Sequence, residues 1–458
     1  MTALRAVVVG AGPAGFYTAD QLLGEGFEVD LLDALPTPFG LVRSGVAPDH
    51  PNIKAVTRVY EKTATRDGFR FFGGVRLGAD VTRAELLERY HAVVYAVGTA
   101  DDNRLGIPGE DRPGSHPATT FVAWYNGHPD GADETFDLSA ERAVVIGNGN
   151  VALDVARMLV LHPDELACTD VADHALEVLA ASRVREVVVL GRRGPAQAAF
   201  TNPELRELGE LRRADVHVAD RDLELDEHSA RWLEEEADAT ARRNVGVLRD
   251  YAGRAPAGAT HRVVLRFLGS PVEVLGPGDD GPVTGVRVAL NRIEPGPDGR
   301  LHAVPTGAEE VIECGLVFRS IGYRGRPLDD VPFDARRSLI RNAGGRVCDE
   351  SGSLQPGEYA VGWIKRGPSG VIGTNKKDAA DTVARIREDR AAGALNPARE
   401  PEAEAAASLY AERAPGAVTW QGWKAIDAYE CGLGAPHGRP RVKVVRLADL
   451  QAAAQALA

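Results

Sequence analysis

The sequence predicts an α/β protein built on two parallel β-sheets, and three observations support this prediction. The apolar run Val7–Val9 ends in Gly10-Ala11-Gly12-Pro13-Ala14-Gly15, and a helical pattern follows at once. The apolar run Ala143–Ile146 ends in a second such turn, Gly147-Asn148-Gly149-Asn150-Val151-Ala152. A third run, Ala92–Val97, is continuously apolar, as expected for a strand buried on both faces of a parallel sheet, and it also ends in glycine. Strand, glycine-rich turn and helix in this order are the fingerprint of a Rossmann-like dinucleotide-binding domain, so we predict two such domains.

The first glycine-rich turn has the spacing that a bound pyrophosphate requires. Gly10 permits the tight turn, Gly12 lets the backbone approach the phosphates, and Gly15 lets the helix pack closely on the strand. The N–H groups and the dipole at the helix start attract the phosphates. The next predicted strand, Glu28–Asp33, ends in a carboxylate at the spacing expected for a ribose ligand. We therefore expect a nucleotide here, with Asp33 on its ribose.

Length and composition limit the class of protein. A chain of 458 residues is too long for one ordinary core, so we expect two or three domains. A hydrophobic content of 44%, with no apolar run long enough to span a membrane, is typical of a soluble protein. The first strand begins close to Met1 and leaves no room for a targeting segment, so we expect a cytoplasmic protein unless a presequence has been removed. The net charge of −13 argues against nucleic acid as the main partner.

The four cysteines are widely separated along the chain, at Cys168, Cys314, Cys348 and Cys431. No C-x-x-C pattern occurs, which excludes a sequence-local dithiol and leaves no spacing for zinc or an iron–sulfur cluster. We therefore expect no metal site, and we expect these residues to be buried thiols in a reducing compartment.

An irregular loop over residues 35–51, with four prolines and two glycines, follows the second strand. It leaves the end of the sheet where ligands bind, and such loops often carry the chemistry. Asp49 or His50 is placed to cap a helix predicted over Asn52–Ala64, so spacing alone favours a capping or surface histidine at His50. A strand near Arg70–Phe72, a helix over Arg83–Arg89 and a crossing into the second domain over Asn103–Gly114 complete this part.

The second domain carries a pair of arginines after its second strand. The predicted strand Glu186–Leu190 ends in Gly191-Arg192-Arg193-Gly194, after a helical insertion over His174–Ser182. Two arginines at this point suit a ribose 2′-phosphate, and so NADP rather than NAD, although a solvated charged face is the alternative interpretation. Helices are predicted over residues 204–213 and 226–244. An antiparallel insertion is predicted over residues 262–304, and a strand near 315–323 closes the domain.

The last part of the chain again shows a strand that ends in glycine. The predicted strand 358–362 leads into a glycine-rich turn over Gly362–Asn375 and then into a helix over Asp378–Ala392. Residues 393–416 are predicted to form a surface helix and a linker. We expect the tail that contains Trp420 and Trp423 to pack back onto the body of the protein.

These motifs together resemble the adrenodoxin-reductase-like NADPH–ferredoxin reductases, and within them the bacterial members. The resemblance rests on the first glycine turn and on five further stretches: Pro38–Pro51 (PFGLVRSGVAPDHP), Gly147–Arg157 (GNGNVALDVAR), Gly191–Pro195, Phe200–Glu207 (FTNPELRE) and Gly362–Ile372 (GWIKRGPSGVI). It implies an NADP domain inserted into a discontinuous FAD domain. The implied boundaries are residues 1–106 and 326–458 for FAD, and 107–325 for NADP.

The resemblance also implies which residues contact each cofactor. For FAD these are the turn residues Gly10, Gly12, Pro13, Ala14 and Gly15, with Asp33, Leu41, Leu77, Gly362, Trp363, Gly370, Val371 and Ile372. For NADP they are Asn148, Gly149, Asn150, Val151, Arg192, Arg193, Glu204 and Gly370. The family usually has glutamate where Asp33 stands, so a longer or water-bridged contact to the ribose is expected.

The implied activity is hydride transfer from NADPH to FAD, followed by single-electron transfer to a ferredoxin that feeds an acceptor such as a cytochrome P450. His50 and Glu204 are the candidate catalytic pair beside the stacked rings, steering the nicotinamide and protons. Ferredoxins are acidic, so a basic docking face is expected near Arg206, Arg212 and Arg213. The alternatives are a flavoenzyme with a quinone or oxygen as acceptor, or a non-catalytic flavoprotein subunit of an electron-transfer complex.

Overall fold

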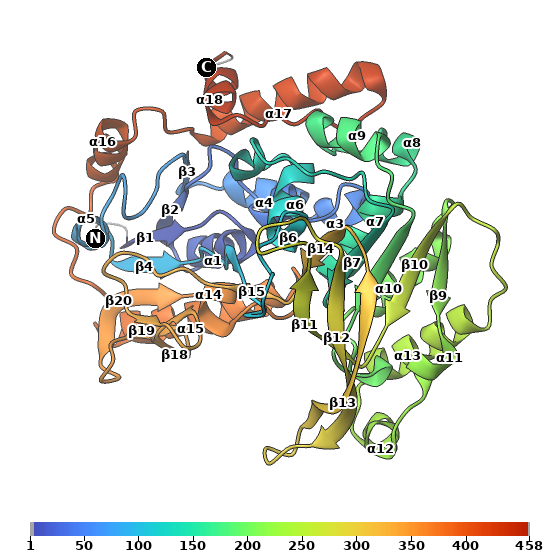
Figure 1. Ribbon diagram of the computed structural model, residues 1–458. Coiled ribbons are helices and arrows are strands. Elements are labelled where there is room, and N and C mark those ends of the chain that lie inside the picture. Colours follow the sequence, from blue (N-terminus) through green and yellow to red (C-terminus); the bar gives the residue numbers. More distant parts are fainter. Residues whose placement is uncertain (1–3, 457–458) are drawn as a thin grey trace. The chain divides into compact units, whose positions relative to one another are not determined.

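The structure is a computed structural model that describes residues 4–456, and it divides into two compact units (Figure 1). The first unit contains the residues up to Asp101, a short piece at Asn126–Ala132, and the residues from Gly322 onward. The second unit contains Asp102–Tyr125 and Asp133–Ile321. The first unit is therefore discontinuous in sequence, and each unit has its own central sheet.

A seven-stranded sheet forms the centre of the first unit, in the order β18-β19-β20-β4-β1-β2-β3. Five neighbouring strands are parallel, namely β3 (Phe69–Gly73), β2 (Phe27–Asp33), β1 (Leu4–Val9), β4 (Ala92–Tyr95) and β20 (Leu354–Ala360). The short strands β19 (Arg346–Cys348) and β18 (Asn342–Ala343) continue the sheet in antiparallel fashion. The order places β1 in the middle of the five parallel strands, at the point where the direction of winding reverses.

Both faces of this sheet are buried, as the apolar runs of its strands predict. Successive side chains of a strand point to opposite faces, so Ala6 and Val8 of β1 lie in one core while Val7 and Val9 lie in another. Helices cover the sheet, and their bounds are α1 (Pro13–Gly24), α2 (Leu41–Ser44), α3 (Pro51–Lys54), α4 (Thr57–Ala64), α5 (Arg83–Arg89), α14 (Trp363–Arg366), α15 (Thr374–Ala391), α16 (Ala403–Arg413), α17 (Trp420–Gly434) and α18 (Leu447–Gln455). A small hairpin, β16 (Phe333–Asp334) with β17 (Leu339–Ile340), is also part of this unit.

The single helix predicted over residues 52–64 is wrong, because the structure contains α3 and α4 instead. Backbone bonds of the tighter i to i+3 type break the helical ladder here, from the N–H of Val56 to the carbonyl of Ile53 and from Arg58 to Ala55. The helix predicted over 378–392 exists, but α15 begins at Thr374.

The C-terminal segment packs more extensively than the sequence predicts. Trp423 is 1% exposed and its ring lies 5.5 Å from that of Phe39, which confirms that the tail packs back. Helix α16 is not a plain surface helix, however. Its Tyr410 is fully buried, contacts the ring of Phe72 at 4.9 Å and shares a hydrogen bond of 2.8 Å with the hydroxyl of Tyr90.

A six-stranded parallel sheet forms the centre of the second unit, in the order β6-β14-β7-β8-β10-β9. Its strands are β6 (Ser115–Pro117), β14 (Leu316–Arg319), β7 (Arg142–Ile146), β8 (Glu186–Leu190), β10 (His261–Arg266) and β9 (Ala214–Val218). The helices are α6 (Ala118–Tyr125), α7 (Asn150–Val160), α8 (Pro163–Leu166), α9 (Asp173–Ala180), α10 (Asn202–Glu207), α11 (Asp220–Leu223), α12 (Glu227–Glu235) and α13 (Ala239–Ala252).

Three sequence-based expectations for this unit are wrong. The helix predicted over 226–244 is two helices, α12 and α13, because the side chain of Asp238 caps the start of a new helix. The helix predicted over 204–213 ends at Glu207, and the strand β9 follows it after a short turn. Strand β10, predicted to begin an antiparallel insertion, is parallel to both β8 and β9, because α13 returns the chain to the starting edge of the sheet before β10 begins. The antiparallel insertion is a separate three-stranded sheet of β11 (Gly269–Leu275), β12 (Gly285–Pro295) and β13 (Leu301–Glu313).

The cysteines also differ from expectation. Cys314 is buried and its burial raises the pKa of its thiol to about 12, but Cys168 is exposed, and Cys348 and Cys431 are half-buried. Within residues 4–456, none of the helices combines the length and the apolar character that crossing a membrane requires.

Candidate functional site

In the turn after β1, the backbone is closely packed at Gly10 and at Gly15, whereas the backbone at Gly12 between them is open. Gly10 has a φ of +111°, and a Cβ added there would lie 2.5 Å from the carbonyl oxygen of Ala96. A Cβ on Gly15 would lie 1.9 Å from the carbonyl oxygen of Gly10. A Cβ on Gly12, in contrast, would meet no atom within 4 Å. The backbone at Gly12 is therefore accessible at the N-terminus of α1, where a pyrophosphate binds in this type of fold.

Asp33 lies at the end of β2 beside this turn. Its carboxylate accepts hydrogen bonds from the backbone N–H of Ala11 at 2.8 Å and of Leu35 at 2.9 Å. These two bonds lower the pKa of Asp33, but burial has the larger effect and raises it to about 6. Each carboxylate oxygen keeps a second lone pair, so the group can also accept a ribose hydroxyl. The residues around the first turn therefore fit a dinucleotide.

The predicted flavin-side residues of the loop after β2 lie close to the same turn. Phe39 has a φ of +83° and its N–H donates to the carbonyl of Ala11 at 2.8 Å. A Cβ on Gly40 would lie 3.0 Å from the Cα of Gly12. Leu41 then begins α2 and is 41% exposed. Leu77, from the segment after β3, is half-buried.

The turn after β20 meets the first turn although the two are far apart in sequence. Gly362 has a φ of +76°, and a Cβ there would lie 2.7 Å from the Cβ of Ala14. Trp363 follows, its ring 5.6 Å from that of Tyr323, and its indole N–H is buried without a hydrogen-bond partner among residues 4–456. Such an orphaned donor fits a site that a ligand completes.

The remaining predicted residues of this turn surround the start of α15. Gly370 has a φ of +78°, Val371 is 57% exposed, and Ile372 packs against the core of the first unit. The N–H of Val371 donates to the hydroxyl of Thr374 at 3.1 Å.

The sequence analysis missed Asp378, which holds the Gly362 turn. Its carboxylate accepts a bond of 2.5 Å from the N–H of Gly362 and pairs with the ammonium of Lys365 at 2.7 Å. The residue is 7% exposed. A carboxylate that falls on the inner face of the helix after a glycine-rich turn is the signal that was available.

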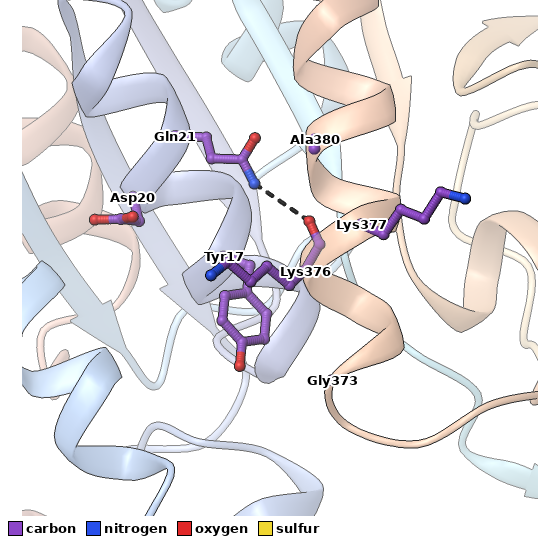
Figure 2. Close-up of a pocket in the computed structure, with 7 residues that line it drawn as sticks. All are labelled: Tyr17, Asp20, Gln21, Gly373, Lys376, Lys377 and Ala380. Carbon is purple, nitrogen blue, oxygen red and sulfur yellow. Dashed lines mark hydrogen bonds between the residues drawn. The ribbon is translucent and has the colours of Figure 1, made fainter.

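A pocket of about 520 Å³ also lies between α1 and α15 (Figure 2). Its lining residues are Tyr17, Asp20, Gln21, Gly373, Lys376, Lys377 and Ala380. The amide of Gln21 donates to the carbonyl of Lys376 across it at 3.3 Å. No residue predicted to bind a nucleotide lines this pocket, so it does not belong to the predicted site.

The turn after β7 in the second unit repeats the geometry of the first. Gly147 has a φ of +130°, and a Cβ there would lie 2.0 Å from the carbonyl oxygen of Ser320. A Cβ on Gly149 would meet nothing within 4 Å. Ala152 stands at the third glycine position and is fully buried. The second turn therefore also presents open backbone at the start of a helix, α7, as phosphate binding requires.

Polar side chains frame this second turn. The carboxamide oxygen of Asn150 accepts from the N–H of Thr201 at 2.7 Å, which ties the turn to the start of α10. The amide nitrogen of Asn148 is buried and lacks a hydrogen-bond partner within the described residues. Val151, in the first turn of α7, is half-buried. As at Trp363, a ligand that accepts a hydrogen bond would satisfy the amide of Asn148.

Among residues 4–456, no carboxylate pairs with the two arginines after β8. Arg192 is exposed and Arg193 is half-buried, and in the part of the chain that the structure describes neither guanidinium forms an ion pair. Burial, together with the charge of Arg192, lowers the pKa of Arg193. Two unneutralised cations side by side favour an anion, and the ribose 2′-phosphate of NADP has the matching charge and geometry.

The two candidate catalytic residues lie in different units. His50, in the first unit, is 8% exposed and precedes α3, but its side chain makes no capping hydrogen bond, so the capping interpretation is wrong. Glu204, in the second unit, is 9% exposed on α10, and its carboxylate lies 3.9 Å from the guanidinium of Arg157. Both side chains are thus buried. Their joint role stays a prediction.

Comparison with known proteins agrees with this geometry. Residues 4–193 match the family model for pyridine nucleotide-disulphide oxidoreductases. The chain is 50% identical to an NADPH-ferredoxin reductase FprA of Mycobacterium leprae, over 97% of this chain and 96% of that protein. It is 40% identical to the mitochondrial NADPH:adrenodoxin oxidoreductase of Arabidopsis thaliana, over 98% and 95% of the two chains.

Among solved structures, FprA of Mycobacterium tuberculosis in complex with NADPH has the same fold. It superposes with a TM-score of 0.92 at 46% identity, over 99% of both chains. The predicted fold class, with two Rossmann-like domains, is confirmed. With relatives this similar over nearly the whole length, the chain belongs to the adrenodoxin-reductase-like family of NADPH–ferredoxin reductases.

Proposed function

We propose that this protein is an NADPH-dependent ferredoxin reductase that carries electrons from NADPH through FAD to a ferredoxin. Membership of the family confirms the predicted enzyme class, an FAD-dependent oxidoreductase that uses NADP(H). One observation supports the assignment of the two cofactors. Each unit has a glycine turn with open backbone, but one turn is followed by a carboxylate and the other by two arginines that form no ion pair with any described residue.

We assign FAD to the first unit and NADP(H) to the second. When bound, FAD takes up a hydride and gives up its electrons one at a time, which NADPH cannot do. In the first unit, the backbone of Gly12 and the N-terminus of α1 bind the pyrophosphate, and Asp33 accepts from the ribose. Leu41, with Leu77 and Trp363, presents apolar surface for the ring system.

In the second unit, the backbone of Gly149 and the amide of Asn148 bind the pyrophosphate region of NADPH. Arg192 and Arg193 bind the 2′-phosphate, which NADH lacks. His50 and Glu204 are our candidates for orienting the nicotinamide and handling protons. Substitution of either is expected to slow reduction of the flavin, and unchanged reduction rates in both single variants would exclude this role.

Among the predicted docking residues for an acidic ferredoxin, Arg206 is the strongest. It is exposed on α10, and its guanidinium has no ion pair among the described residues. Arg212 lies 3.5 Å from the carboxylate of Glu165, and Arg213 donates to a backbone carbonyl. Arg212 is therefore partly neutralised and Arg213 is half-buried, so both are less available to a partner than Arg206. Docking at Arg206 and a cytoplasmic location are parts of this proposal.

Anaerobic mixing of the purified yellow protein with NADPH, and separately with NADH, tests the proposal. Oxidised flavin absorbs at about 450 nm, so its reduction is seen as bleaching at this wavelength. We expect rapid bleaching with NADPH, slower bleaching with NADH, and recovery when oxidised ferredoxin is added. A chain without flavin, or with a flavin that NADPH leaves oxidised, would refute the proposal. Bleaching that ferredoxin does not reverse but a quinone does would indicate another acceptor.

A further inference from the structure

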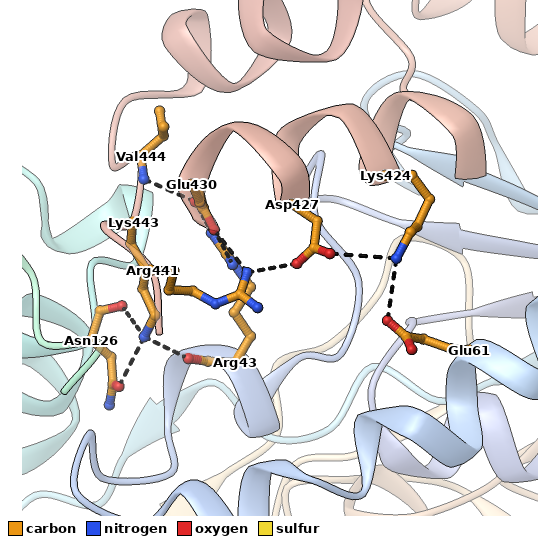
Figure 3. A network of polar contacts seen from close by, with 9 residues as sticks. All are labelled: Arg43, Glu61, Asn126, Lys424, Asp427, Glu430, Arg441, Lys443 and Val444. Atoms are coloured by element: carbon orange, nitrogen blue, oxygen red, sulfur yellow. Dashed lines mark hydrogen bonds and ion pairs between the residues drawn. The ribbon is translucent and has the colours of Figure 1, made fainter. Parts of the chain in front are cut away.

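A buried ion pair joins the loop after β2 to the C-terminal segment of the chain (Figure 3). The guanidinium of Arg43, on α2, donates to the two carboxylate oxygens of Glu430, on α17, at 2.9 and 2.5 Å. Arg43 is 9% exposed and Glu430 is 0% exposed. A two-bond contact of this kind fixes direction as well as distance, since the planar fork of arginine matches the carboxylate.

Further contacts from the same segment bind Arg43. Its guanidinium lies 5.3 Å from the centre of the Trp423 ring, and its carbonyl accepts from the ammonium of Lys443 at 3.0 Å. Both the side chain and the backbone of α2 are therefore held by residues of the C-terminal segment.

Glu430 is itself held in place from three sides. It accepts from the guanidinium of Arg441 at 3.2 Å and from the N–H of Val444 at 2.9 Å, in addition to Arg43. Burial raises the pKa of this carboxyl, but the charges of Arg43 and Arg441 outweigh it, so the pKa lies below its usual value. Glu430 is thus a charged anchor whose position does not depend on α2 alone.

The segment that this anchor holds needs external support. Helix α2 has only four residues, too few to be stable without tertiary contacts. Two residues before this helix, the buried Phe39 has a φ of +83°, a strained conformation that persists only where the surroundings enforce it. On this side, Gly40 packs against Gly12 of the pyrophosphate turn. Arg43 follows Leu41 in the sequence, so Leu41 is fixed between two held residues, Gly40 before it and Arg43 after it.

We propose that Arg43 and Glu430 are positioning residues that hold Leu41 against the FAD ring system. The inference rests on the proposed function, because it takes Leu41 as a contact of FAD. It gives the C-terminal segment a role in setting the environment of the flavin. An anchor that only attached this segment to the protein would not affect the flavin.

Arg43→Lys tests the inference, because lysine keeps the positive charge but cannot form both bonds of the fork. The FAD-loaded variant is compared with the unmodified protein by the visible absorption of its flavin, by its FAD dissociation constant from flavin fluorescence on serial dilution, and by thermal unfolding. We expect a shifted flavin absorption band. We also expect FAD to bind about ten-fold more weakly, the equivalent of one hydrogen bond to a charged group.

Asp427→Asn is the matched control. Asp427 lies on α17, as Glu430 does, and pairs with Arg441 at 2.8 Å in the network that Figure 3 shows. Its pairs with Arg441 and Lys424 do not involve α2. We expect this variant to lose thermal stability and to keep the flavin spectrum and the FAD affinity of the unmodified protein.

The inference is overturned if Arg43→Lys loses thermal stability but keeps both the flavin spectrum and the FAD affinity. It is also overturned if Arg43→Lys and Asp427→Asn change the flavin spectrum and the FAD affinity equally. Should Arg43→Lys fail to fold, Glu430→Gln takes its place with the same expected and refuting results, since glutamine keeps the shape and one acceptor. A chain that never retains FAD, even unmodified, would refute the proposed function instead.

Discussion

Replacing Arg193 by glutamine should reverse part of the preference for NADPH over NADH, and the structure sets the size of the effect. Arg193 is half-buried, and its guanidinium has no ion pair within the described residues, so a bound 2′-phosphate is its expected partner. A hydrogen bond between two charged groups contributes about 1.5–3 kcal/mol, which corresponds to about a ten- to 150-fold change in the dissociation constant. The exposed Arg192 should contribute at the lower end of this range, because water screens its charge.

The assay is anaerobic bleaching of the flavin as a function of NADPH and of NADH concentration. We expect the dissociation constant of NADPH to rise by the amount given above, while that of NADH stays the same, because NADH has no 2′-phosphate. Arg206→Gln is the control, since Arg206 is also cationic but lies on α10 rather than at the end of β8. Equal losses for the two nucleotides, or no loss for either, would refute the assignment of the 2′-phosphate to this pair of arginines.

Four other results are expected. Burial raises the pKa of Asp33 to about 6, and a ribose hydroxyl donates best to the ionised carboxylate, so FAD should bind more weakly as the pH falls below 6, by up to about ten-fold per pH unit. Equal FAD affinities at pH 5 and pH 7 in a fluorescence titration would contradict this. Gly15→Ala should abolish FAD retention, because its Cβ would lie 1.9 Å from the carbonyl oxygen of Gly10; a yellow variant would count against the tight packing. Trp423→Ala should lower the free energy of unfolding in urea by about 3–5 kcal/mol, and a negligible loss would show that this ring is not part of the core. Arg206→Glu should slow ferredoxin reduction at low salt and reduce its dependence on ionic strength, whereas unchanged kinetics would exclude this docking face.

Local patterns in the sequence determined the kind of fold and the two turns of the site. The glycine spacings at Gly10 and Gly147 predict strand, turn and helix because each requirement, a positive φ or a close approach, involves only a few neighbouring residues. The positions of the arginines after β8 and of the carboxylate after β2 could be predicted for the same reason. Their position at a strand end is a local property, and the edge of a parallel sheet where strands end is where ligands bind.

Only the tertiary structure decided which distant segments support these turns. Arg43 and Glu430 are 387 residues apart, and nothing in the periodicity around either residue indicates the other. The bond from the Gly362 turn to Asp378, the burial of Tyr410 and the parallel pairing of β10 were missed in the same way. Hydrophobic period and turn chemistry describe one element at a time, whereas an ion pair or a strand neighbour depends on how elements pack. The framework of the candidate site could therefore be predicted from the sequence, and the distant residues that support it could not.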